Sequence, residues 1–372
     1  MKMLIEKKIL LGGLNAVSRA LSTRNIIPVL NGIKFDLTKK GLYLTATDND
    51  ITIQYYIDKK EIKSIDDVGV SIIYGKSMLE IVKRLPETDI LIENVEGNEV
   101  SFRTETALYN FNCFQEDDFP NVFLDDSKEP IVFDGLKFKE TINKTSFACS
   151  LQESRPLLTG INIKMTGDIF ECIATDSYRL AKLTYTINRD KTDNINIVIP
   201  SRNINEFVKL LNDEQEVEMN VYSNKVIFRT GNITFQSSLL NGSYPNTDNS
   251  IAKEFKYMAK VNLKNFYSIL DRASLLTQSK DKNIIDMEIV DNKLIIRASS
   301  SEMGNVEEKM EIDNETSNIL KISFSAKFML DALKMFDDEE IYLLLNGEIS
   351  PIILKKLNSD EMIQLILPMK TY

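Results

Sequence analysis

The 372-residue chain contains no histidine. Histidine is the commonest general base in enzymes and the usual partner of a nucleophilic serine or cysteine, so its absence excludes Ser-His-Asp and Cys-His catalysis. It also removes a frequent zinc ligand. The sequence therefore excludes the enzyme classes whose mechanism requires a histidine.

Cysteine is scarce as well. Cys113, Cys149 and Cys172 are widely spaced, lie in apolar contexts and form no CxxC pair. This pattern is typical of buried free thiols in a reducing compartment and argues against a zinc site. We therefore expect no metal and no cofactor.

Long apolar runs are also missing. No segment approaches the roughly 18 residues of a membrane-spanning helix. Charges interrupt the N-terminal sequence MKMLIEKKILLGGLNAV, and no signal-peptide cleavage site follows it. The hydrophobic content of 43% and the charged content of 27% are ordinary for a globular protein. The sequence predicts a cytoplasmic protein without a membrane partner, long enough for two or three domains.

What the chain does contain is a distinctive stretch over residues 147–181. It reads as the end of a helix, a loop, a strand over 160–165, a turn and a second strand over 170–175. The second strand ends in the polar corner TDSYR at 175–179. The strand predictions depend on alternating apolar residues in the first segment and a continuous apolar run in the second.

The same order recurs near both ends of the chain. RNIIPVLNGIKFDLTKKGLYLTATDND and KNIIDMEIVDNKLIIRASSSEMG each contain two strands followed by a polar corner. Thr47 lies 128 positions before Thr175, and Ser300 lies 125 positions after it. Amphipathic helices are predicted over 7–21, 75–86, 136–150, 200–213, 263–277 and 325–338. The fold class is therefore α+β, with three copies of one domain at 1–126, 127–251 and 252–372.

Charge is distributed unevenly along the chain. The net charge of −10 argues against nucleic-acid binding, because DNA affinity comes largely from Lys and Arg. All six predicted helices are nevertheless positive, with a total of about +11 when the fifth is extended to Lys282, which leaves about −21 elsewhere. If the helices share a face, that face is basic and suits sequence-independent phosphate contacts.

The three repeats, together with STRNIIPVLNGI, SRPLLTGINI, ATDSYRLA and the terminal LPM, resemble the β subunit family of bacterial DNA polymerase III, the sliding clamps. The resemblance covers the whole chain. It implies three DNA-clamp domains that pair head to tail in a homodimeric ring, with helices inside and sheets outside. Such a ring encircles double-stranded DNA without sequence specificity and is not an enzyme. It tethers the replicative polymerase, the clamp loader and repair proteins through short linear peptides.

The resemblance also implies three sets of site residues. The DNA-contacting positions are Arg24, Lys76, Gln152, Arg155 and Arg202. The partner-peptide pocket comprises Leu158, Thr175, Ser177, Tyr178, Arg179, Leu180, Pro245, Ser350, Pro351, Leu365, Leu367, Pro368 and Met369. The dimer interface comprises Leu275 and Leu276, set against Lys76 and Glu80. Asn249, Ser250 and the tail beyond Met369 depart from some relatives.

Two other functions compete with this prediction. In an enzyme, Asp48 and Asp176 of the two Thr-Asp corners would be paired carboxylates, but duplicated positions in separate domains usually cap turns. A repeat scaffold that binds peptides without enclosing DNA would explain the pocket and not the charge of the helices.

Overall fold

The structure is a computed structural model that describes residues 1–21, 27–124, 128–188, 194–212, 215–277, 283–316 and 319–370. All six predicted helices are confirmed, but most of them are shorter than predicted. They are α1 (Lys7–Val17), α2 (Gly75–Arg84), α3 (Gly135–Ser146), α4 (Ser201–Val208), α5 (Leu263–Leu275) and α6 (Ala326–Leu333). Pro200, predicted to begin a helix, instead ends a strand. Within the described ranges, no helix is long and apolar enough to cross a membrane.

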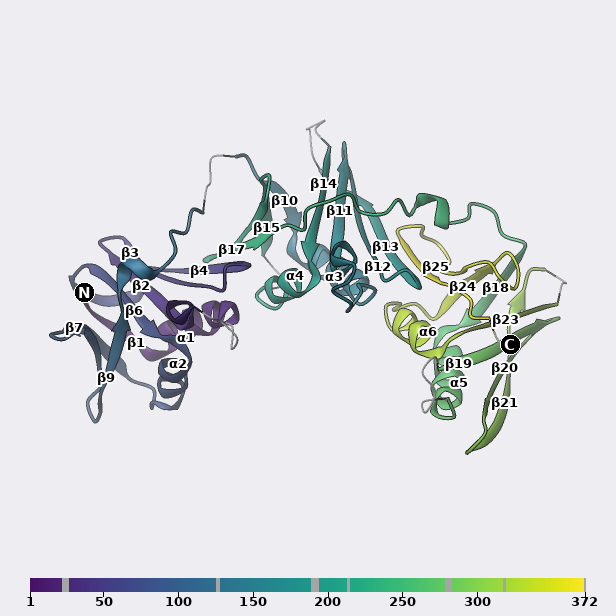
Figure 1. Cartoon of the computed structure of the whole chain (residues 1–372), viewed down its shortest axis with the longest axis horizontal. Coiled ribbons are helices and arrows are strands. Elements are labelled where there is room, and N and C mark those ends of the chain that lie inside the picture. Colours follow the sequence, from purple (N-terminus) through teal and green to yellow (C-terminus); the bar gives the residue numbers. More distant parts are fainter. Residues whose placement is uncertain are drawn as a thin grey trace. The chain divides into compact units, whose positions relative to one another are not determined.

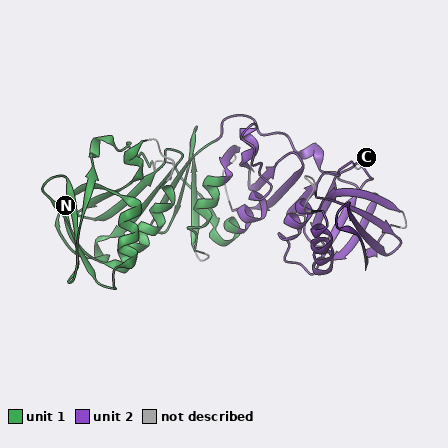
Figure 2. Ribbon diagram, turned by 60° about the horizontal axis from the view of Figure 1, so that its bottom comes forward, with its two compact units in different colours: residues 1–139, 202–239 green, residues 140–201, 240–372 purple. Residues whose placement is uncertain are grey.

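The chain forms two compact units, residues 1–139 with 202–239 and residues 140–201 with 240–372 (Figure 2). The first unit contains one sheet of 13 strands, in the order β10-β15-β16-β17-β4-β3-β2-β6-β9-β8-β7-β1-β5. Its strands are β1 (Lys2–Glu6), β2 (Gly32–Thr38), β3 (Gly41–Thr47), β4 (Ile51–Asp58), β5 (Ile62–Asp67), β6 (Gly69–Tyr74), β7 (Asp89–Val95), β8 (Glu99–Arg103), β9 (Leu108–Phe114), β10 (Ile131–Asp134), β15 (Glu216–Val221), β16 (Lys225–Thr230) and β17 (Ile233–Ser238).

The second unit contains two sheets. One has nine strands in the order β14-β11-β12-β13-β26-β25-β24-β18-β22, and the other has four in the order β21-β20-β19-β23. The nine are β11 (Gly160–Thr166), β12 (Ile169–Thr175), β13 (Arg179–Thr186), β14 (Ile195–Pro200), β18 (Tyr257–Asn262), β22 (Asp313–Asn314), β24 (Glu340–Leu345), β25 (Ile352–Lys356) and β26 (Met362–Ile366). The four are β19 (Ile284–Val290), β20 (Lys293–Ser300), β21 (Gly304–Glu311) and β23 (Leu320–Ser325).

Strand pairing continues from one repeat into the next. In each repeat one strand follows the polar corner (β4, β13 or β21) and another is the last strand (β9, β17 or β26). The corner strand β4 pairs antiparallel with β17, the last strand of the following repeat, and β13 pairs with β26 in the same way. The units therefore cut through the central repeat, because each half of that repeat shares a sheet with a neighbouring repeat.

Apolar helix faces cover these sheets. In the first unit, Phe207 of α4 stacks on Phe228 of β16 with ring centroids 4.6 Å apart, and Phe138 of α3 meets Phe228 at 5.6 Å. In the third repeat, α5 and α6 lie side by side and bury Phe266, Leu270 and other apolar residues against the sheets (Figure 1). The helical period predicted from the sequence thus corresponds to a buried stripe on each helix.

Candidate functional site

The polar corner of the central repeat is a tight turn between β12 and β13. The Thr175 hydroxyl donates to the carbonyl of Arg179 at 2.6 Å, and Asp176 Oδ1 accepts the amides of Tyr178 and Arg179 at 2.9 and 3.0 Å. Ser177, between them, has φ of 75°, a conformation uncommon outside glycine. The short polar side chains replace the backbone partners that a regular strand would supply.

The first repeat forms the same turn. Thr47 donates to the carbonyl of Ile51 at 2.9 Å, and Asp48 Oδ1 accepts the amides of Asp50 and Ile51 at 3.1 and 2.8 Å. Asn49 has φ of 75°, like Ser177. Both aspartates therefore cap turns, as the duplication predicted, and both have one carboxylate oxygen committed to backbone amides.

A groove of about 170 Å³ lies beside the central corner. Its floor is apolar, since Leu158, Leu180 and Leu365 are each only 4% exposed. Tyr178, at 55% exposed, stands at its edge. An open apolar groove with a few polar groups suits a short extended peptide or a small ligand.

Both sides of the groove are held by backbone pairing. Arg179 of β13 pairs with Ile366 of β26, and the amide of Leu367 donates to the carbonyl of Tyr178 at 2.8 Å. Farther along the tail, the amide of Met369 donates to the carbonyl of Ser323 at 2.7 Å. Residues 367–369 are therefore held by two hydrogen bonds, one to Tyr178 of the central corner and one to Ser323 of the third repeat.

The structure brings most of the predicted pocket residues together. Those that line the groove are Leu158, Thr175, Ser177, Tyr178, Arg179, Leu180, Pro245, Leu365 and Leu367. Ser350, Pro351, Pro368 and Met369 are not among its lining residues. The sequence prediction missed Asn246 and Thr247, and it treated Ser250 only as a departure from relatives, yet all three line the groove. They continue the loop from Pro245, and adjacency to that proline was the available signal.

Three buried titratable groups of the central repeat have raised pKa values. Tyr244 is 9% exposed, its hydroxyl accepts the amide of Thr175 at 3.1 Å, and burial raises its pKa. Burial also raises the pKa of the Cys149 and Cys172 thiols to about 12. Cys149 and Cys172 are free and buried, as predicted, and their raised pKa values make them poor nucleophiles. Cys113, predicted to be buried as well, is only partly buried.

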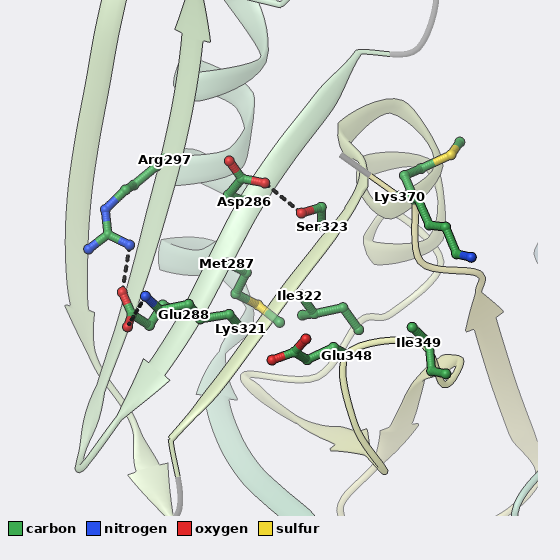
Figure 3. Close-up of a pocket in the computed structure, with 11 residues that line it drawn as sticks. Asp286, Met287, Glu288, Arg297, Lys321, Ile322, Ser323, Glu348, Ile349 and Lys370 are labelled. Atoms are coloured by element: carbon green, nitrogen blue, oxygen red, sulfur yellow. Dashed lines mark hydrogen bonds and ion pairs between the residues drawn. The ribbon is translucent and has the colours of Figure 1, made fainter. Parts of the chain in front are cut away.

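A second cavity, of about 510 Å³, lies in the third repeat (Figure 3). Glu288 lines it and forms ion pairs with Arg297 at 2.6 Å and Lys321 at 3.3 Å, and these two cations lower its pKa. Ser323 donates to Asp286 at 2.5 Å. Met369, predicted for the peptide pocket, lines this cavity instead of the groove.

Three family models together match nearly the whole chain. They are the N-terminal, central and C-terminal domains of the DNA polymerase III beta subunit, over residues 1–123, 133–246 and 249–370. The chain belongs to the DNA polymerase III β subunit family. It is 35% identical to the beta sliding clamp of Bacillus subtilis and 33% identical to that of Halalkalibacterium halodurans, with complete coverage of both chains. The crystal structure of the Bacillus subtilis DNA polymerase sliding clamp superposes with a TM-score of 0.97, 34% identity and complete coverage.

The positions that family resemblance assigned to DNA have different environments. Arg24 lies outside the described residues. Lys76 on α2 and Gln152 in the loop before β11 are exposed. Arg155 donates to Ser177 Oγ at 2.9 Å, and Arg202 lies 3.5 Å from Asp48.

The residues predicted for the β subunit dimer interface also differ from one another. Leu275, the last residue of α5, is 57% exposed. Leu276 is half-buried and packs against the core of the third repeat. On α2, Glu80 is exposed and bridges Lys83 at 3.3 Å and Arg84 at 3.6 Å.

The predicted basic character of the helices needs correction. Within the observed bounds, α1 to α6 carry +2, +2, +2, 0, +1 and 0, a total of +7 and not +11. Arg19, Lys209 and Lys334 fall beyond the ends of α1, α4 and α6, and Lys280, Asp281 and Lys282 lie outside the described residues. Lys7 is buried, with its Nζ donating to the carbonyl of Leu85 at 2.6 Å. Among the residues the structure describes, no cluster of three metal-ligating side chains occurs.

Proposed function

We propose that two copies of this chain close head to tail into a ring that encloses duplex DNA and keeps the replicative polymerase on its template. The ring is a non-catalytic processivity factor that works on DNA in the cytoplasm. Its repeats are those predicted at 1–126, 127–251 and 252–372. One observation carries this proposal, namely the strand pairing between successive repeats.

That pairing leaves two of the described strands without an equivalent partner, namely the corner strand of the third repeat and the last strand of the first repeat. The corner strand of each repeat pairs with the last strand of the following repeat, in β4–β17 and in β13–β26. Among the described residues, the corner strand β21 pairs only with β20, and β9 pairs with β8 along its length and with β6 at two residues near its end. A second copy, bound head to tail, would pair β21 of each chain with β9 of the other, and closed rings are favoured for head-to-tail interfaces.

The β4–β17 pairing (the first junction) and the β13–β26 pairing (the second junction) also predict the register of the interface between two copies. Ile51 pairs with Ser237 across the first junction, and Arg179 pairs with Ile366 across the second. The hairpin pair Ser300–Gly304 corresponds to Thr47–Thr52 and Thr175–Leu180, and the aromatic-Pro-Asn ends align Gln236 with Phe111. The equivalent pairing therefore sets Gly304 opposite Phe111 and Glu307 opposite Leu108. Leu275, exposed at the end of α5, belongs to the same interface in this proposal.

Disulfide trapping tests this register. In a Cys113→Ser background, Leu108→Cys with Glu307→Cys should oxidise to a covalent dimer, because opposed cysteines meet the distance requirement. The matched control, Phe111→Cys with Glu307→Cys, places one thiol on the opposite face of β9. Equal cross-linking of both pairs, or none of either, would contradict the proposed register.

The same trap tests enclosure of DNA. Oxidation in the presence of a nicked circular plasmid should produce rings that remain on the plasmid in 1 M salt and leave it once it is linearised. Phosphate contacts alone do not survive that salt concentration. A peptide-binding scaffold without DNA enclosure would be retained on neither DNA.

We also assign the groove to short linear peptides of the polymerase, clamp loader and repair proteins. Its three buried leucines offer apolar anchoring, and the free backbone of a bound peptide would meet the exposed corner. Leu367→Glu should abolish binding of a fluorescein-labelled decapeptide with an adjacent Leu-Phe pair. Unchanged binding would place the peptide elsewhere.

A further inference from the structure

The guanidinium of Arg179 joins two repeats beside the groove. Its Nε donates to Asp176 Oδ2 at 3.0 Å within the central corner, and its Nη1 donates to Asp331 Oδ2 at 2.8 Å on α6. The Arg179 side chain is only 11% exposed and that of Asp331 29%. Charge-assisted bonds of this geometry are among the stronger hydrogen bonds in proteins.

Aromatic rings cover the same guanidinium. The Arg179 Cζ lies 4.6 Å from the ring centroid of Phe328 on α6 and 5.3 Å from that of Phe147. Tyr178, at the edge of the groove, stacks on Phe328 with centroids 6.4 Å apart. The planar guanidinium suits this arrangement in a way that a lysine ammonium does not.

The groove needs such a connection because its two sides come from different repeats. Leu180 and Tyr178 belong to the central repeat, whereas Leu365 and Leu367 belong to the third. The Tyr178–Leu367 hydrogen bond and the β13–β26 pairing join their backbones. The Arg179 side chain connects the corner onward to α6 through Asp331, beside the Tyr178–Phe328 stack.

The β4–β17 junction has no arginine at the position equivalent to Arg179, so it serves as a comparison. There the residue at the equivalent position is Ile51, and the corner carboxylate of Asp48 meets Arg202 of α4 directly at 3.5 Å. The Arg202 side chain is 70% exposed. The second junction thus has a buried, two-carboxylate link where the first has an exposed contact, and solvent screening weakens the exposed contact more.

We propose that Arg179 is a positioning residue that fixes the shape of the groove by locking the central corner to α6 through Asp331. Asp331 does not line the groove, so its effect on a bound peptide passes through Arg179. This inference rests on the proposed function of the groove. It assigns to α6 a part in partner recognition.

Asp331→Asn tests the link without touching the groove. It should weaken binding of the labelled Leu-Phe decapeptide about 5- to 10-fold, which is near 1–1.4 kcal/mol. Arg179→Ala should weaken it at least as much, and the double variant should be no weaker than Arg179→Ala alone, because both remove one link. Asp337→Asn is the matched control, since it breaks the Lys144–Asp337 pair at 2.7 Å without touching the corner, and it should change affinity less than 2-fold.

Amide exchange gives a readout that a general loss of stability would not reproduce. In Asp331→Asn the Leu367 amide, which donates to Tyr178, should exchange faster, while the Met369 amide, which donates to Ser323, should not change. Wild-type affinity and unchanged Leu367 exchange in Asp331→Asn, with loss only in Arg179→Ala, would make Arg179 a direct ligand contact and overturn the proposal. If Leu367→Glu also bound the peptide normally, the groove assignment itself would fail.

Discussion

Arg155 Nη1 donates a hydrogen bond to Ser177 Oγ at 2.9 Å. Arg155 was predicted to contact DNA and Ser177 to line the peptide groove, so the bond joins a residue of one proposed site to a residue of the other. Arg155 therefore helps to hold the corner in a backbone conformation with positive φ at Ser177.

Substitutions at Ser177 should reveal the strain of that conformation. Ser177→Val should lower the free energy of unfolding by about 1–2 kcal/mol, because a β-branched residue disfavours positive φ. Ser177→Asn, which tolerates this conformation, should cost less. Urea denaturation measures the free energy of unfolding of both variants. Equal losses would mean that the cost comes from losing the Arg155–Ser177 hydrogen bond and not from the positive φ at position 177.

Lys7 and Lys8 should separate stability from DNA retention. Lys7→Ala should destabilise the chain by about 1–3 kcal/mol, because the buried carbonyl of Leu85 loses its donor. Lys8 is exposed, so Lys8→Ala should leave stability within about 0.5 kcal/mol of wild type. If α1 faces DNA, only Lys8→Ala should weaken DNA retention in low salt without a stability loss.

Thr247 carries a hydroxyl that is buried without a hydrogen-bond partner among the described residues, in a side chain only 5% exposed overall. Thr247→Val keeps the shape and removes the uncompensated polar atom. It should therefore raise the free energy of unfolding by about 1 kcal/mol. A loss of stability in thermal denaturation would show that the hydroxyl has a partner in solution.

The buried thiols should make stability depend on alkaline pH. The pKa of Cys172 rises from 9.0 to about 12 in the folded chain, so the folded state retains a proton that the unfolded state loses. The contribution of Cys172 to stability is then constant below pH 9 and falls as the pH rises from 9 towards 12. Cys172→Ala should reduce the slope between pH 9 and 10 in urea titrations, and an unchanged slope would contradict this.

Leu275→Asp should test the interface without disturbing the fold. Leu275 is 57% exposed in the single chain, whereas Leu276 packs on the core, so the double substitution would confuse interface and folding effects. A charge in a closed interface should convert a dimer into a folded monomer in sedimentation equilibrium. Leu151→Asp, at a leucine 96% exposed, is the matched control and should remain dimeric.

Much of the fold could be predicted from periodicity and repetition. The strands predicted over 160–165 and 170–175 correspond to β11 and β12, and the Thr-Asp corners form the expected caps. The helix ends were less predictable. For example, α4 ends at Val208, although apolar spacing continues to Leu211, because the residues after Val208 form single turns instead of further helix.

The candidate site was predictable where it follows the repeat and not where it depends on folding. Leu158, Tyr178 and Leu365 matched the family pattern and do line the groove. Asn246 and Thr247 carry no such pattern, and their place in the groove depends on the path of the loop after Pro245. The buried position of Lys7 was equally invisible, because a charged residue at the start of a helix normally faces solvent.

By itself, the sequence determined the three repeats, their helices and hairpins and the polar corners, because periodicity and turn chemistry are local properties of the chain. Tertiary structure alone decided which strand edges meet and which charges are buried. The pairing of β13 with β26 and the bond from Arg179 to Asp331, 152 positions away, are long-range contacts. Backbone hydrogen bonds between strands are the same for every residue type, so the sequence does not indicate which strands pair.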